Sequence, residues 1–167
     1  MGRRKPRVFA MVVSLSLSLV VLSGGNCPAE PPAARTPPKP VAGTWVGEVI
    51  GVRFRLSIVE GGSVDPWLNS RELTGSGWLI YGTPAESVAV ALFGANMGDP
   101  TPGVGLEFAR PGGMGGAYGH YNGVLGADGV LLGPFERYGA SVEPVPSPWT
   151  DVWPAGASAV SLRLTRQ

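Results

Sequence analysis

The stretch GTWVGEVIGVRFRLSIV, residues 43–59, carries the clearest structural pattern in the chain. Within residues 52–58 the even-numbered side chains are all apolar, and the odd-numbered ones are arginine or serine. Such alternation predicts a strand with one buried and one solvated face. The stretch IGV, residues 50–52, leaves almost no room for a connection, so we expect residues 43–50 and 52–60 to pair as a hairpin.

The same period of two recurs along the rest of the chain, with Gly, Pro and Asp between the repeats. It predicts eight strands, at residues 43–50, 52–60, 72–81, 86–94, 103–110, 117–125, 129–138 and 158–166. Apart from the N-terminal apolar run, no stretch predicts an amphipathic helix of ten residues or more. Consecutive strands with mostly short connections indicate an all-β fold, an antiparallel eight-stranded up-and-down barrel without a free edge. Pro134 lies inside the seventh predicted strand, where it requires a bulge or an unpaired position.

The entry to the first strand, Gly43-Thr44-Trp45, resembles the Gly-x-Trp entry of the calycin barrels, which include lipocalins and avidins. The resemblance implies a barrel in which Trp45 packs across one end under an arginine from the last strand. Arg163 and Arg166 are the candidates for that arginine. It does not extend to the polar biotin-binding residues that follow this tryptophan in avidins.

The chain divides into three predicted segments. Residues 1–25 join an arginine- and lysine-rich start to an apolar run and then to small residues, which is the order of a secretory signal peptide. Residues 26–40 contain six of the chain's 17 prolines and predict a disordered tether. Residues 41–167 are long enough for one domain with its own core, the predicted barrel. We therefore expect an exported protein, periplasmic or at the cell surface.

Cys27, the only cysteine in the chain, lies two residues after the predicted signal. It resembles the lipidated cysteine of bacterial lipoproteins, although Asn26 stands where those proteins carry a small residue. The alternative is an incidental cysteine near a cleavage site after Gly25 or Ala29. A single thiol excludes an internal disulfide, so the domain depends on its core for stability.

Charge argues against nucleic acid as a partner. The chain has 13 basic and 12 acidic residues, and removing the four cations among residues 1–25 leaves a net charge near −3. The remaining arginines are scattered singly, whereas nucleic-acid surfaces need clustered cations to displace counterions.

A candidate binding site follows from the order of the strands. Connections after the first, third, fifth and seventh strands meet at one end of an up-and-down barrel, and they include the longest, residues 139–157. In that connection SPWTDVW predicts one helical turn, capped by Ser147, with Trp149 and Trp153 on one side. The residues predicted at this end are Tyr81, Met114, Tyr118, His120, Tyr138, Trp149 and Trp153. They suit a small apolar ligand; alternatively, the aromatic rings only cap the core.

Catalysis has no support in the sequence. No Ser-His-Asp arrangement matches the strand order, and Glu107 and Glu136 are carboxylates on separate predicted strands. His120 alone does not make a metal site, and GGMGG at 112–116 matches no nucleotide-binding loop. We expect no enzyme, no cofactor and no metal. Two functions remain: a barrel that binds a small hydrophobic ligand at one end, or a filled barrel that acts as a structural or interaction protein of the cell envelope.

Overall fold

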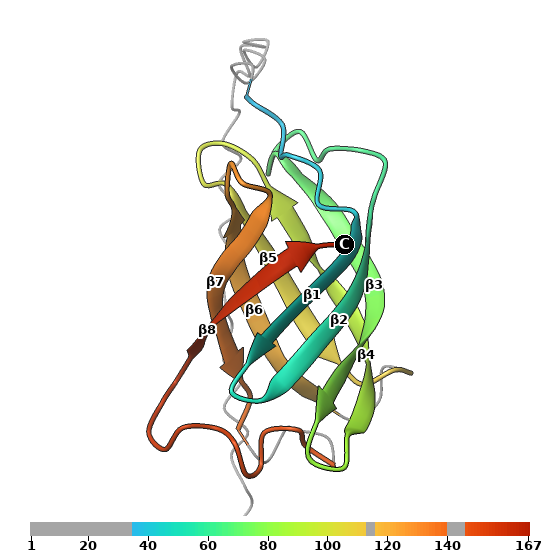
Figure 1. Ribbon diagram of the computed structural model, residues 1–167. Coiled ribbons are helices and arrows are strands. Elements are labelled where there is room, and N and C mark those ends of the chain that lie inside the picture. Colours follow the sequence, from blue (N-terminus) through green and yellow to red (C-terminus); the bar gives the residue numbers. More distant parts are fainter. Residues whose placement is uncertain (1–34, 113–115, 140–145) are drawn as a thin grey trace, which may run out of the picture. The chain divides into compact units, whose positions relative to one another are not determined.

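The computed structural model describes residues 35–112, 116–139 and 146–167. These residues belong to the second of two compact units in the chain, Pro32–Gln167. They form a closed barrel in which each strand pairs antiparallel with its neighbours in sequence and β1 pairs with β8 (Figure 1). The eight strands are β1 (Gly43–Val49), β2 (Val52–Glu60), β3 (Ser70–Tyr81), β4 (Glu86–Met97), β5 (Gly103–Ala109), β6 (Ala117–Leu125), β7 (Val130–Arg137) and β8 (Val160–Arg166). The predicted all-β, eight-stranded up-and-down barrel is therefore confirmed.

β3 and β4 are longer than the sequence pattern predicts. β3 starts at Ser70 rather than at residue 72, and β4 continues to Met97 instead of stopping at Gly94. Ser70 pairs with Met97, so the two extensions form a single additional stretch of ladder. Gly94 does not end β4. It allows the backbone of β5 to approach closely, because a Cβ at this position would meet the Gly105 carbonyl. A glycine inside a strand can mark close approach as well as an end.

Pro134 occupies an interruption in the ladder. β6 and β7 pair at Tyr121 with Phe135 and again at Val124 with Leu132, and no pair joins β6 to Pro134. On its other side Pro134 pairs with Ser161 of β8. The missing N–H of proline is thus accommodated at an unpaired position on the β6 side, as the sequence required.

Trp45 lies fully buried near the start of β1. It connects the first strand of the domain to the last. Its indole Nε1 donates a hydrogen bond to the Val41 carbonyl, with a donor–acceptor distance of 2.8 Å. The Arg166 guanidinium lies 5.0 Å from the centre of the indole ring. Arg166, rather than Arg163, is therefore the arginine of the last strand that covers this tryptophan, in the arrangement that the calycin resemblance implied.

Replacing Arg166 by alanine should lower the free energy of unfolding by about 0.5–2 kcal/mol, the usual contribution of a cation over an aromatic face. The same side chain donates to the Pro40 carbonyl at 3.0 Å, so the preceding chain should also loosen. Arg163→Ala is the matched control because it removes an arginine from the same strand. Urea denaturation of both variants measures the difference, and equal losses would contradict the assigned role of Arg166.

The barrel has two distinct ends. The connections after β1, β3, β5 and β7 lie at one end, which we call the loop end. The chain entering β1 and the C-terminus after β8 lie at the other, which we call the terminal end (Figure 1). In the described residues no helix has the length and hydrophobicity needed to cross a membrane.

Candidate functional site

The loop end is closed by part of the long connection between β7 and β8. The Ser147 Oγ accepts the N–H of Trp149 at 3.2 Å, and the Trp149 carbonyl accepts the N–H of Trp153 at 3.1 Å. This is the single capped turn that SPWTDVW predicts, since Ser147 satisfies an N–H at its start. The turn carries Trp149, whose fully buried ring packs on Phe54 and Phe135 inside the barrel.

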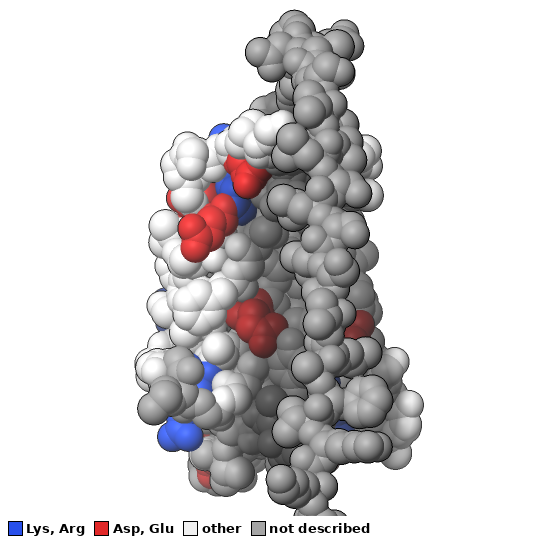
Figure 2. Space-filling view, turned by 180° about the vertical axis from the view of Figure 1, so that it is seen from behind, with Lys and Arg blue, Asp and Glu red and all other residues white. Residues whose placement is uncertain are grey.

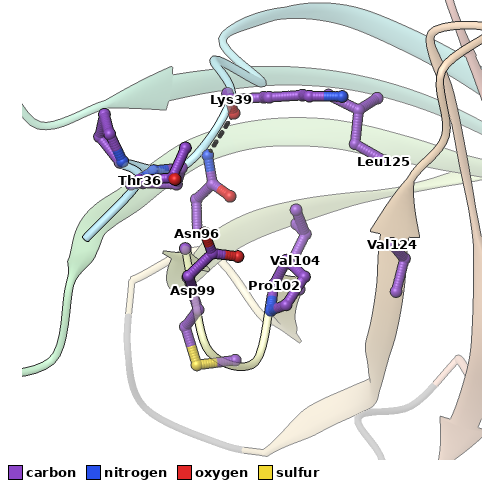
Figure 3. A pocket seen from close by; sticks show the side chains of 13 residues that line it. Thr36, Lys39, Asn96, Asp99, Pro102, Val104, Val124 and Leu125 are labelled. Carbon is purple, nitrogen blue, oxygen red and sulfur yellow. Dashed lines mark hydrogen bonds between the residues drawn. The ribbon is translucent and has the colours of Figure 1, made fainter.

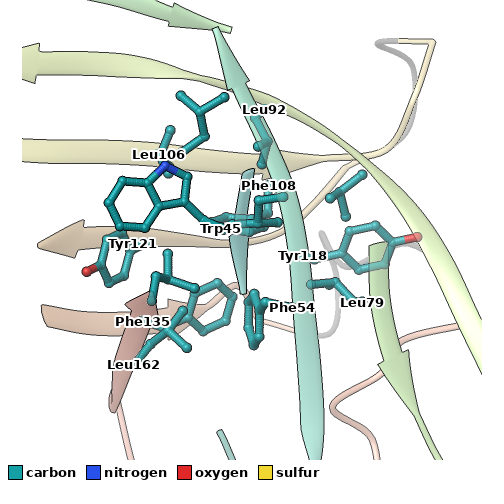
Figure 4. Close-up of a cluster of buried hydrophobic side chains, with 14 of the residues drawn as sticks. Trp45, Phe54, Leu79, Leu92, Leu106, Phe108, Tyr118, Tyr121, Phe135 and Leu162 are labelled. Carbon is teal, nitrogen blue, oxygen red and sulfur yellow. The ribbon is translucent and has the colours of Figure 1, made fainter. Parts of the chain in front are cut away.

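Trp149 belongs to a cluster of buried aromatic rings inside the barrel. Its ring centre lies 5.0 Å from that of Phe135 and 6.0 Å from that of Phe54. Phe54, Phe108 and Phe135 meet edge to face, with ring centres between 5.3 and 5.8 Å apart. Figure 4 shows these three rings pointing toward one another from strands β2, β5 and β7. Such edge-to-face packing is favourable for aromatic rings and fills this part of the interior with side chains.

The residues predicted for the binding site separate into three groups. Tyr118 and Trp149 are buried together, and the Trp149 Nε1 donates to the Tyr118 carbonyl at 2.9 Å. Tyr81 and Trp153 are partly buried and pack against the core from the rim of the loop end. His120 and Tyr138 lie on the outer wall, and Met114 lies outside the described residues. Only the first two groups share the loop end of the interior.

On the outer wall, His120 stands in one cross-strand row with two carboxylates. It pairs with Glu107 of β5 on one side and with Glu136 of β7 on the other. Its Nε2 lies 3.6 Å from the Glu136 Oε2, and the Tyr138 hydroxyl donates to the Glu107 Oε2 at 2.7 Å. In the described part of the chain no group of three or more His, Cys, Asp or Glu side chains could hold a metal ion. The row is a polar cluster on the surface of β5–β7, in which Tyr138 donates the one side-chain hydrogen bond described.

The Tyr138 phenol gives this cluster a measurable pH dependence. Burial, together with the hydrogen bond to Glu107 and the charge of that carboxylate, raises the pKa of Tyr138 to about 12 from its ordinary value of 10.0. The unfolded state then loses this proton at a lower pH than the folded state does. Stability from this group is complete below about pH 10 and falls as the pH rises toward about 12.

We therefore expect the urea midpoint to fall between about pH 10 and pH 12, and Tyr138→Phe to remove part of that fall. Tyr81→Phe is a suitable comparison, because burial and the Glu86 carboxylate raise the pKa of Tyr81 in the same direction. Denaturation curves at several alkaline pH values measure both. A pH slope that Tyr138→Phe leaves unchanged would show that the phenol does not contribute.

At the terminal end, residues 35–42 lie across the barrel rather than leaving it, and we call them the strap. The buried Asn69 donates from Nδ2 to the Thr36 carbonyl at 2.8 Å and to the Asp99 carbonyl at 3.0 Å. The buried Asn96 donates from Nδ2 to the Lys39 carbonyl at 2.7 Å and to the Glu60 carboxylate at 2.7 Å. The described part of the predicted tether therefore packs on the barrel, because two buried amides satisfy its carbonyls.

A pocket of about 220 Å³ lies between the strap and the ends of β4, β5 and β6 (Figure 3). In Figure 3 Thr36 and Lys39 lie on the strap side, and Pro102 and Val104 lie on the barrel side. The full lining is Thr36, Pro37, Pro38, Lys39, Asn96, Met97, Gly98, Asp99, Pro102, Gly103, Val104, Val124 and Leu125. Proline, valine, leucine and methionine make most of the wall apolar, and the Asn96 amide supplies a polar edge.

Sequence reasoning missed this pocket, because it placed the site at the opposite end. The sequence pattern predicts a tether for residues 35–40. Nothing in the neighbouring sequence distinguishes Asn69 or Asn96 from surface asparagines. In the structure Asn69 has a positive φ of 50°, which asparagine tolerates better than most residues, but this angle is not visible in the sequence. Charge offers no further signal: on the face shown in Figure 2 a cation lies among carboxylates near the top, and no large patch of one charge is visible.

Comparisons with known proteins add no family to this picture. No protein family, curated protein or solved structure matches the chain. The function must therefore be argued from the barrel itself.

Proposed function

We propose that this chain is an exported, non-enzymatic interaction protein of the cell envelope, built on a filled β-barrel. The predicted export signal in residues 1–25 and the proline-rich segment after it support the location. The observation that carries the proposal is the cluster of almost fully buried aromatic rings. Trp149 packs on Phe54 and Phe135, and Phe108 packs on the same two phenylalanines. An eight-stranded barrel can be filled by side chains or hold one small ligand, and this cluster supports the filled form.

The outer wall of β3 and β4 supplies a surface for a protein partner. Trp78 is 50% exposed and Phe93 is 51% exposed, and both project outward. The outward-facing side chains of β4 after Glu86 carry no charge, namely Ser87, Ala89, Ala91, Phe93, Ala95 and Met97. Since a closed barrel offers no free strand edge, a partner must dock on these side chains rather than extend the sheet. The surface suits an apolar patch on another envelope protein.

Site-specific cross-linking in native membranes tests this function. A photoreactive residue at position 78 should yield a defined adduct, and one at position 132 should not. Leu132 is a matched control because it is 55% exposed on β7, away from the β3–β4 wall. Phe93→Ser should abolish the adduct if the wall is the interface. Recovery of the free monomer from position 78 in every preparation would contradict the proposal.

A second candidate is binding of a small apolar ligand in the pocket at the terminal end. The strap is held by Asn69 and Asn96, so the pocket exists without a ligand, and its volume fits a single ring or a short chain.

Indole is a suitable probe, with binding followed by nuclear magnetic resonance through the Val104 methyl and Asn96 amide resonances. Met97→Trp should fill the pocket from its rim and abolish saturable shifts. Resonance shifts at Trp149, in place of those at Val104 and Asn96, would locate the ligand at the loop end.

A further inference from the structure

Two large apolar side chains project from the connection between β2 and β3 at the terminal end. Trp67 is 77% exposed and Leu68 is 71% exposed. Among the exposed large hydrophobic residues of the described chain these two have the highest exposures, and they are adjacent in sequence. Exposure of neighbouring large apolar side chains at a loop tip commonly marks an interaction site.

The backbone beneath these side chains is fixed. The Asp65 Oδ1 accepts the N–H groups of Trp67 at 2.8 Å and Leu68 at 2.9 Å. Asp65 also bridges to Ser70, with its N–H donating to the Ser70 carbonyl at 2.7 Å. Below them the buried Asn69 connects the loop to the strap and to Asp99. The tip is therefore held with its apolar side chains outward, so its exposure does not come from a loose loop.

The chain enters the barrel beside this tip. Arg35, at the start of the described strap, donates from Nη1 to the Trp67 carbonyl at 3.2 Å. Cys27, the predicted lipidation site, lies eight residues before Arg35. Eight extended residues span at most roughly 26–29 Å. A chain anchored near Cys27 would therefore hold the terminal end, with Trp67 and Leu68, close to the surface that anchors it.

We propose that Trp67 and Leu68 insert into the interfacial region of the phospholipid bilayer to which the chain is tethered. Tryptophan suits that region because its ring is apolar and its N–H is polar. A short tether gives the tip a high effective concentration at the membrane, so two side chains suffice for docking. This inference rests on the export in the proposed function and on an anchor at Cys27, and it uses a different surface from the β3–β4 wall.

The single cysteine makes a direct test practical. The chain from Asn26, which retains the compact unit Pro32–Gln167, is coupled through Cys27 to a maleimide lipid in phosphatidylethanolamine–phosphatidylglycerol vesicles. Doxyl-labelled lipids then quench tryptophans that enter the bilayer. We expect the shallow quencher to reduce the fluorescence of the parent chain, and Trp67→Phe to remove most of the quenched component. Leu68→Ala should reduce it by several-fold through loss of apolar contact with the lipid.

Trp78→Phe is the matched control, since Trp78 is also exposed but lies on the β3–β4 wall. It should leave the quenched component intact. An unquenched parent chain, or equal loss in Trp67→Phe and Trp78→Phe, would overturn the lipid assignment. A protein cross-link from position 67 without lipid quenching would overturn it in favour of a protein partner. Failure of the lipid assignment would not change the cross-link expected from position 78. The two proposals are therefore tested separately.

Discussion

Replacing Trp149 by alanine is expected to lower the free energy of unfolding by about 3–5 kcal/mol, the usual cost of deleting a large buried aromatic side chain. The ring is fully buried between Phe54 and Phe135, so its loss leaves a cavity in the aromatic cluster. It also leaves the Tyr118 carbonyl without the indole donor. Urea denaturation measures the loss.

The matched control is Trp78→Ala, which removes the same side chain from the outer wall. Its effect should stay within about 1 kcal/mol, because half of the Trp78 surface is already exposed. Equal losses of stability in the two variants would contradict the packing of the Trp149 ring in the core.

Gly47→Val is expected to destabilise the protein by at least about 2 kcal/mol, or to prevent folding. A Cβ added at Gly47 would lie 2.8 Å from the Leu164 Cδ2 and would also meet the Arg163 carbonyl. Gly47 pairs with Leu164 where β1 joins β8, so the added side chain would separate the strands that close the barrel.

Gly62→Val is the control for this experiment, since no atom lies within 4 Å of a Cβ at that exposed position. It should change the unfolding free energy by no more than about 0.5 kcal/mol. The far-ultraviolet spectrum and the thermal midpoint of both variants decide the outcome. A Gly47→Val variant as stable as the parent would mean that β1 and β8 do not pack as closely as described.

The strands were predictable because their signal is local. Alternation in residues 52–58 reports which side chains face inward, and that pattern survives in β2 without change. Trp45 and Arg166 could be matched because a Gly-x-Trp entry and a terminal arginine are both visible in the sequence. Strand ends were less predictable, as Gly94 illustrates, because a glycine can end a strand or let two backbones approach.

The candidate sites depended on contacts that are distant in sequence. The turn around Trp149 could be predicted from Ser147 and Pro148, but its burial depends on Phe54, which lies far away in the chain. The cross-strand row at His120 depends on register, which shifts between Phe108 and Ala109. The pocket depends on where the amides of Asn69 and Asn96 point. No local pattern encodes any of these.

The central claim is that side chains fill the barrel, so that the protein acts through its exterior. Titration with N-phenyl-1-naphthylamine, with excitation of tryptophan, tests it most directly. Our account predicts no saturable energy transfer from Trp149 in the parent chain, because its ring already packs on Phe135. Saturable one-to-one transfer that disappears in Trp149→Phe would contradict the account and establish a ligand-carrying interior.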